Sequence, residues 1–329
     1  ICNKKWLFNF LEVTIMSALV ETMFYVRETP WHGLGTKVDE APTSAEAIKL
    51  AGLDWNVVCE PIYTADNIEI PNMKANIRET DRSVLGVVSD RYKLVQNKEA
   101  FEFTDSLINE EVRYETAGAL KNGKVVWMLA KMPERKILDD KFDPYICFTN
   151  SFDGSGAIRA CMTPVRVVCQ NTLNLALDTT TRQWSTRHIG DIDSKLIEAQ
   201  HTLGLANDYM DGLSDEANKL VEVKVTDAQL EAIFDELYPI DITKDSQRKI
   251  NNVFDFKEKL FKCYNMPDIS QYKGTAWGII NATTDLVDHM APARMTENYR
   301  ENNWGTIMLG HPLVDLMYKK LNALEKVEA

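Results

Sequence analysis

The pattern of apolar residues changes near Gly190, and this change limits the possible folds of the 329-residue chain more than any other feature. Before it, short apolar runs alternate with turn residues, as in antiparallel strands. After it, apolar residues recur at helical spacing over about 192–220, 227–238, 243–265, 275–290 and 305–326. The sequence therefore predicts an α+β fold, with an antiparallel, hairpin-rich core domain over 16–190 and a mainly helical region over 191–329.

Asn122-Gly123 is the strongest hairpin signal, because both residues tolerate the positive φ angles of a two-residue turn. It predicts a hairpin between strands over 113–120 and 125–129. Further strands are expected over 55–61, 84–88, 145–149, 157–162 and 182–188.

Helix starts are marked by Thr and Pro at several points. Thr163 as N-cap and Pro164 at the first helical position predict a helix over 164–177. Thr226 and Thr243 are expected to cap two helices of the C-terminal region. A shorter helical pattern precedes Gly52, where it should end.

The first fifteen residues are typical of a translated upstream leader. Leu11-Glu12-Val13 can be encoded by GGAGGT, a bacterial ribosome-binding sequence, and two residues then separate it from Met16. A signal peptide fits less well, because Asn9 and Glu12 interrupt the apolar run. We expect residues 1–15 to lie outside the fold and the natural chain to start at Met16.

Charge is distributed unevenly along the chain, whose formal net charge is −12. Residues 16–150 carry −6 and residues 191–329 carry −9, whereas residues 151–190 carry +2. The balance excludes a protein coated in basic surface, but it leaves room for a local basic site. No stretch of about 18 apolar residues is present, so no membrane span is expected.

Six cysteines and five histidines form no CxxC pair and no zinc-finger spacing. Free, buried thiols in a reducing cytoplasm are the expectation, and this includes Cys161 and Cys169. The chain has neither GxxxxGK[ST] nor GxGxxG after a strand. We therefore expect no cofactor.

The densest motif region runs from Thr149 to Thr172, where small polar residues join two predicted strands and arginines follow. Backbone N–H groups at a helix start, together with arginines, could hold phosphate groups. The alternative is a tight hairpin turn followed by an ordinary amphipathic helix. The candidate nucleic-acid-binding residues are Asn150, Ser151, Asp153, Arg159, Arg166, Asn171, Arg182 and Arg187.

A second cluster comprises Asp285, Asp288 and His289, which share one face of a predicted helix. Two carboxylates and an imidazole so placed could bind a metal, and His32 could approach them in the fold. Such groups more often form hydrogen bonds with neighbouring elements. We therefore expect no metal and keep the cluster as an alternative site.

Several motifs together resemble the phage/plasmid-like proteins of domain-of-unknown-function group 932. The resemblance covers nearly the whole chain from Met16 onward. The family usually carries His where this chain has Phe152, so we expect no catalytic or metal-binding role at that position. The motifs that carry the resemblance lie at 30–35, 90–97, 149–155, 164–173 and 274–289.

The resemblance implies a mobile-element protein in the cytoplasm of a bacterial host. The predicted hairpins and helix between 112 and 177 are similar in type to those of single-strand annealing recombination proteins. We therefore expect a non-enzymatic protein that binds single-stranded nucleic acid and could anneal strands or act in replication or recombination. A homo-oligomeric assembly would fit this role. The alternatives are a metal-dependent hydrolase at Asp285, Asp288 and His289, and an interaction protein that acts against host defence.

Overall fold

The computed structural model describes most of the chain in nine stretches. Residues 1–15 and His32 lie outside them, so the expectations for the leader and for His32 stay predictions. The side chains of Arg166 and Asn171 are also outside the described set. The described residues are 20–26, 36–39, 42–107, 113–166, 171–177, 182–192, 194–198, 206–290 and 310–328.

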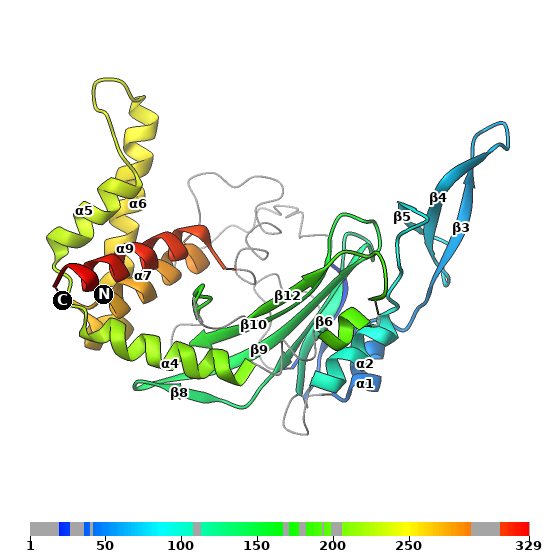
Figure 1. Ribbon diagram of the computed structural model, residues 1–329, viewed down its shortest axis with the longest axis horizontal. Coiled ribbons are helices and arrows are strands. Elements are labelled where there is room, and N and C mark those ends of the chain that lie inside the picture. Colours follow the sequence, from blue (N-terminus) through cyan, green and yellow to red (C-terminus); the bar gives the residue numbers. More distant parts are fainter. Residues whose placement is uncertain are drawn as a thin grey trace, which may run out of the picture.

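A large sheet forms the first half of the fold, and strands far apart in sequence lie next to each other in it (Figure 1). Its strand order is β11-β10-β9-β7-β6-β1-β2, with β8 paired to β9 and β12 paired to β10. Neighbouring strands are antiparallel except for β1 and β2. The strands are β1 (Val20–Tyr25), β2 (Thr36–Lys37), β6 (Arg113–Leu120), β7 (Val125–Lys131), β8 (Arg135–Ile137), β9 (Asp140–Ser151), β10 (Ile158–Arg166), β11 (Asn171–Thr172) and β12 (Gln183–Thr186).

A second sheet of three antiparallel strands projects from one end of the large sheet (Figure 1). It consists of β3 (Val57–Tyr63), β4 (Glu69–Arg78) and β5 (Val84–Ser89). Two short helices, α1 (Ser44–Leu50) and α2 (Asn97–Leu107), pack beside it against one face of the large sheet. Thr43 and Glu46 form a capping box at the start of α1, and the chain leaves this helix through Gly52 at φ +63°.

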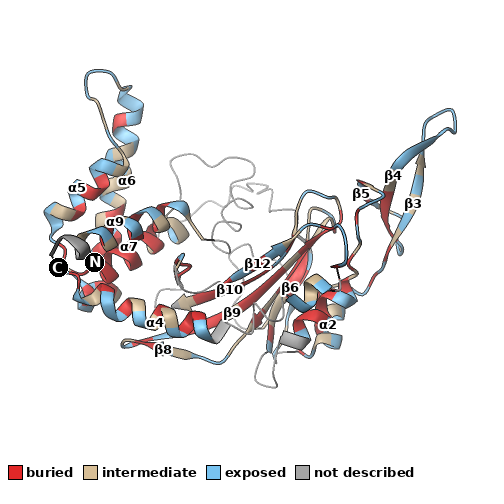
Figure 2. Cartoon of the chain, in the orientation of Figure 1, coloured by how far each residue is buried: buried red, intermediate tan, exposed pale blue. Residues whose placement is uncertain are grey.

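The C-terminal region is helical, with α7 at its centre. Helix α7 is buried along nearly its whole length, as Figure 2 shows. It packs in one core with side chains from β9, β10 and the segment after β11, including Phe142, Met162 and Leu173. The helices are α4 (Ala206–Glu222), α5 (Asp227–Leu237), α6 (Gln247–Tyr264), a 3₁₀ helix η1 (Pro267–Tyr272), α7 (Ala276–His289) and α9 (Pro312–Glu328).

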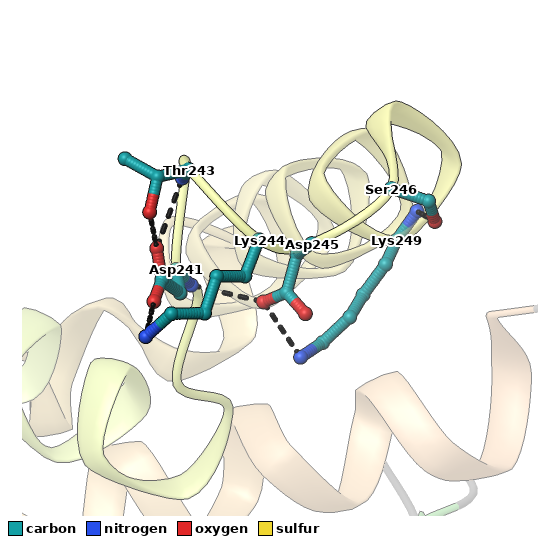
Figure 3. A network of polar contacts seen from close by, with 6 residues as sticks. All are labelled: Asp241, Thr243, Lys244, Asp245, Ser246 and Lys249. Atoms are coloured by element: carbon teal, nitrogen blue, oxygen red, sulfur yellow. Dashed lines mark hydrogen bonds and ion pairs between the residues drawn. The ribbon is translucent and has the colours of Figure 1, made fainter.

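Two predicted N-caps have different outcomes. The hydroxyl of Thr226 accepts a hydrogen bond from Gln229 N at 3.2 Å, so it caps α5 as predicted. Thr243 does not cap α6: its hydroxyl donates to Asp241 at 2.6 Å, and Ser246 is the N-cap (Figure 3). Hydrogen bonds from Thr243 and Lys244 lower the pKa of Asp241.

The helix predicted over 164–177 is wrong, because Pro164 lies inside strand β10, opposite Pro144 of β9. The carbonyl of Pro164 faces β11, where it accepts from Leu173 N at 2.9 Å, and that of Pro144 accepts from Met132 N at 2.8 Å. In an antiparallel pair the N and O of one residue face the same neighbour. Both prolines thus turn their missing N–H away from the β9–β10 ladder, and neither breaks it.

The predicted fold class is confirmed: the fold is α+β, with strands before helices along the chain. The hairpin at Asn122-Gly123 is also confirmed, since Leu120 pairs with Val125 and both turn residues have positive φ. Among the described residues, no helix combines the length and the apolar character needed to cross a bilayer.

Candidate nucleic-acid interface

One end of the large sheet gathers turns that lie far apart in sequence (Figure 1). The hairpin between β6 and β7, the turn between β9 and β10, and the segment after β12 all lie there, because these strands are antiparallel neighbours. Phe152 N donates to Lys124 O at 2.7 Å, which joins the first two of these turns. We call this region the turn end and define it by Lys93, Lys124, Arg159, Arg187 and residues 152–157.

Buried hydrogen bonds hold the 150–156 loop in place. Asn150 Nδ2 donates to Val95 O at 2.9 Å, and Asn76 Nδ2 of β4 donates to Phe152 O at 2.6 Å. The Ser151 hydroxyl donates to Gly156 O at 3.0 Å. The side chains of Asn150, Ser151 and Phe152 are therefore buried parts of the scaffold.

Residues 153–156 form the outer part of this loop. Asp153 Oδ1 accepts from Ser155 N at 2.8 Å, a local bond that stabilises the turn. Asp153 is half-buried, whereas Gly154 and Ser155 are exposed. A Cβ added to Gly86 of β5 would lie 2.4 Å from Asp153 Cα, so the small sheet contacts this loop backbone to backbone.

Tyr92 and His188 connect the loop to the segment after β12. Their rings stack with centroids 4.4 Å apart, and the Tyr92 hydroxyl donates to Ser151 O. His188 Nδ1 lies 2.9 Å from Lys93 O, and because a carbonyl only accepts, Nδ1 carries the proton. Lys93 N in turn donates to His188 O at 2.7 Å. Lys93 and Arg187 are thereby brought into the same region.

The predicted arginines occupy different environments. Arg159 is exposed near the start of β10, opposite Ser185 of β12, and Arg187 is exposed two residues beyond Ser185. Arg182 is only 7% exposed, and its Nη1 donates to Met162 O at 3.2 Å. The structure thus places Arg159 and Arg187 at the same end of the large sheet and Arg182 inside the fold.

A family model described as a domain of unknown function, DUF932, matches residues 84–304, about two thirds of the chain. The chain belongs to the DUF932 family. The searches of curated proteins and of solved structures found no match. The DUF932 match begins at the first residue of β5 and spans the 150–156 loop, His188 and α7. It also continues across Gly190, where the sequence predicts a domain boundary.

The alternative cluster of the DUF932 region lies at the C-terminal end of α7. Asp285 and Asp288 are half-buried, and His289 is exposed. Asp285 forms a hydrogen bond with the Cys263 thiol, and burial together with this carboxylate raises the pKa of Cys263 to about 12. Within the described part of the chain, no group of three or more His, Cys, Asp or Glu side chains could hold a metal ion.

Sequence reasoning missed Lys93 and Lys124, which the fold adds to Arg159 and Arg187. Lys93 is exposed and Lys124 is half-buried. Both follow turn motifs, Ser89-Asp90 and Asn122-Gly123, so the signal was present. That signal could not show that the two turns lie at the same end of the sheet as the arginines.

Proposed function

We propose that this DUF932 protein binds single-stranded nucleic acid through the turn end. The observation that carries the proposal is the convergence of Lys93, Lys124, Arg159 and Arg187 on one region of a chain whose net charge is −12. A local basic site attracts phosphates even when the whole protein is acidic, because screening limits charge interactions to about 8 Å at physiological salt.

The aromatic residues near this region indicate what kind of contact to expect. Trp55 packs against Phe152 and has the Arg78 guanidinium over its ring, and Tyr92 stacks on His188. Both Trp55 and Tyr92 are 7% exposed. With these rings engaged in the fold, phosphate contacts would dominate binding, so binding would depend weakly on sequence and steeply on salt.

The test is fluorescence anisotropy with a labelled oligothymidine, at low and moderate salt. Arg159→Glu and Arg187→Glu should each weaken binding by about tenfold at low salt. Arg248→Glu makes the same charge change at an exposed position of α6, away from the turn end, and should change affinity less than about twofold. Absence of wild-type binding at micromolar protein and low salt would refute the proposal, as would an equal loss in the control.

The phage or plasmid setting, strand annealing, the homo-oligomer and the bacterial cytoplasm stay predictions from the resemblance. The cytoplasmic setting agrees with the described cysteines, Cys59, Cys147, Cys161 and Cys263, which are all free thiols. Annealing is tested by mixing complementary labelled strands with the protein. Sedimentation with and without the oligonucleotide reports the assembly.

A further inference from the structure

Cys147 and Cys161 lie directly opposite each other on strands β9 and β10. They are 1% and 3% exposed and form a small cluster of their own, with Leu129 of β7 packed against them. Their neighbours Phe148 and Ala160 belong instead to the core that contains α1 and α2. Since side chains alternate along a strand, both thiols point to the other face of the large sheet.

The backbone pattern shows which kind of pair they form. Met162 N donates to Arg182 O, and Pro164 O accepts from Leu173 N. The backbone N–H and C=O groups of the even-numbered residues of β10 therefore point toward β12 and β11. Cys161 therefore turns its backbone N–H and C=O toward Cys147. The Cα atoms of such a hydrogen-bonded pair lie about 5.5 Å apart, which matches the commonest disulfide separation of about 5.5–6 Å.

A bond between these thiols would be easily reversed. Opposite Cβ atoms on antiparallel strands lie about 4.5–5.5 Å apart, whereas a disulfide holds them at about 3.8 Å. Closing the bond therefore draws the two strands together. Disulfides that distort their surroundings in this way are more readily reduced than relaxed ones.

The two thiols have opposite pKa shifts. A hydrogen bond from the Cys147 thiol lowers the pKa of Cys161, and the nearby Arg182 guanidinium and Thr163 hydroxyl lower it further, against the effect of burial. The same hydrogen bond, together with burial, raises the pKa of Cys147. Since the thiolate is the nucleophile, Cys161 reacts first. Cys161 keeps 3% of its surface exposed, and the residue paired with it on β12, Gln183, is exposed.

We propose that Cys147 and Cys161 are a reversible redox modification site, which hydrogen peroxide converts from two thiols to a disulfide. The Cys161 thiolate attacks one peroxide oxygen, the O–O bond breaks, and the hydroxide that leaves takes up a proton to form water. The Cys147 sulfur then attacks the resulting sulfenic acid and loses its proton, and a second water leaves as the S–S bond forms. The two thiols lose two electrons, and the peroxide gains them. The proposal does not depend on nucleic-acid binding.

The first test uses the purified full-length chain. The protein is treated with hydrogen peroxide, denatured in an alkylating agent, digested and mapped by mass spectrometry. We expect a linked pair of peptides that contain Cys147 and Cys161, two hydrogens lighter than the separate thiols and restored by dithiothreitol. Full alkylation of both residues after the treatment, or linkage through any other of the six cysteines, overturns the proposal.

Two variants test the order of reaction. In Cys147→Ser, dimedone should trap a sulfenic acid at Cys161, whereas in Cys161→Ser the Cys147 thiol should remain unmodified. Cys59→Ser, which removes an exposed thiol, should leave the linkage unchanged. Trapping only at Cys147 would contradict the assignment of roles. The mapping on the wild-type chain decides the proposal even if a variant does not fold.

Discussion

The imidazole of His188 stacks on the phenol ring of Tyr92, with ring centroids 4.4 Å apart and planes 12° apart. His188 is 2% exposed, and its Nε2 has no hydrogen-bond partner. Burial lowers the pKa of His188 below its ordinary 6.5. The folded state therefore holds this ring neutral, against the Tyr92 ring and with Nδ1 bonded to Lys93 O.

Acid should weaken the fold through His188. Below pH 6.5 the unfolded chain binds a proton at this position that the folded chain does not, so the free energy of unfolding falls as the pH drops toward the lowered pKa. His188→Phe keeps a ring on Tyr92 but cannot titrate. Urea unfolding at pH 7.5 and 5.0 should show a smaller acid-induced loss in the variant than in the wild type. His311, whose pKa burial also lowers, contributes equally to both proteins. Equal losses would contradict the prediction.

Asn150 should matter for stability rather than for binding. Asn150→Ala removes the 2.9 Å hydrogen bond to Val95 O and leaves a buried carbonyl without its donor. The expected loss is about 1–3 kcal/mol in the free energy of unfolding. Ser155→Ala, at an exposed position of the same loop, should stay within about 0.5 kcal/mol. Urea denaturation measures both, and comparable losses in the two variants would refute the assignment.

Replacing Arg182 should lower the free energy of unfolding much more than replacing Arg159. Arg182→Met removes a buried guanidinium group that donates a hydrogen bond to Met162 O. The same group lowers the pKa of Asp315, which burial raises. We expect a loss of about 3 kcal/mol for this variant. Arg159→Met, at an exposed position, should change stability by less than about 0.5 kcal/mol. Chemical denaturation of both variants checks this, and a similar cost at both positions would show that Arg182 has no structural role.

Removing the charge of Asp153 should strengthen nucleic-acid binding if the turn end is the interface. Asp153→Asn keeps an oxygen that can accept from Ser155 N, so the turn is retained, while a negative charge within the turn end disappears. We expect an affinity gain of a few-fold at low salt that vanishes at high salt, because screening removes the charge effect. Anisotropy titrations at two salt concentrations measure it. Weaker binding would place the carboxylate among the contacts instead.

Local signals predicted much of the fold because local chemistry decides them. Thr226 caps α5 since its hydroxyl reaches an N–H only three residues away, and Asn122-Gly123 forms a turn because both residues accept positive φ. Thr163-Pro164 led to a wrong helix prediction, because this dipeptide fits two structures. It can start a helix, or it can lie in a strand where the proline nitrogen points away from the hydrogen-bonded neighbour. Whether the dipeptide starts a helix or joins a strand depends on its pairing with Pro144 and Leu173. The local sequence does not show this pairing.

The sequence by itself determined the order of strands before helices, the hairpins at 113–129 and 145–162, and the presence of an arginine-bearing segment in an acidic chain. The tertiary structure alone decided which arginines face solvent, because strand register and helix packing buried Arg182 and left Arg159 exposed. It also brought Lys93 and Lys124 to the same end of the sheet as Arg159 and Arg187, and it set Cys147 opposite Cys161. The physical reason is that antiparallel pairing places residues from distant parts of the chain side by side. The strand register that pairs them is set by which side chains are buried in the folded protein, and not by their neighbours in sequence.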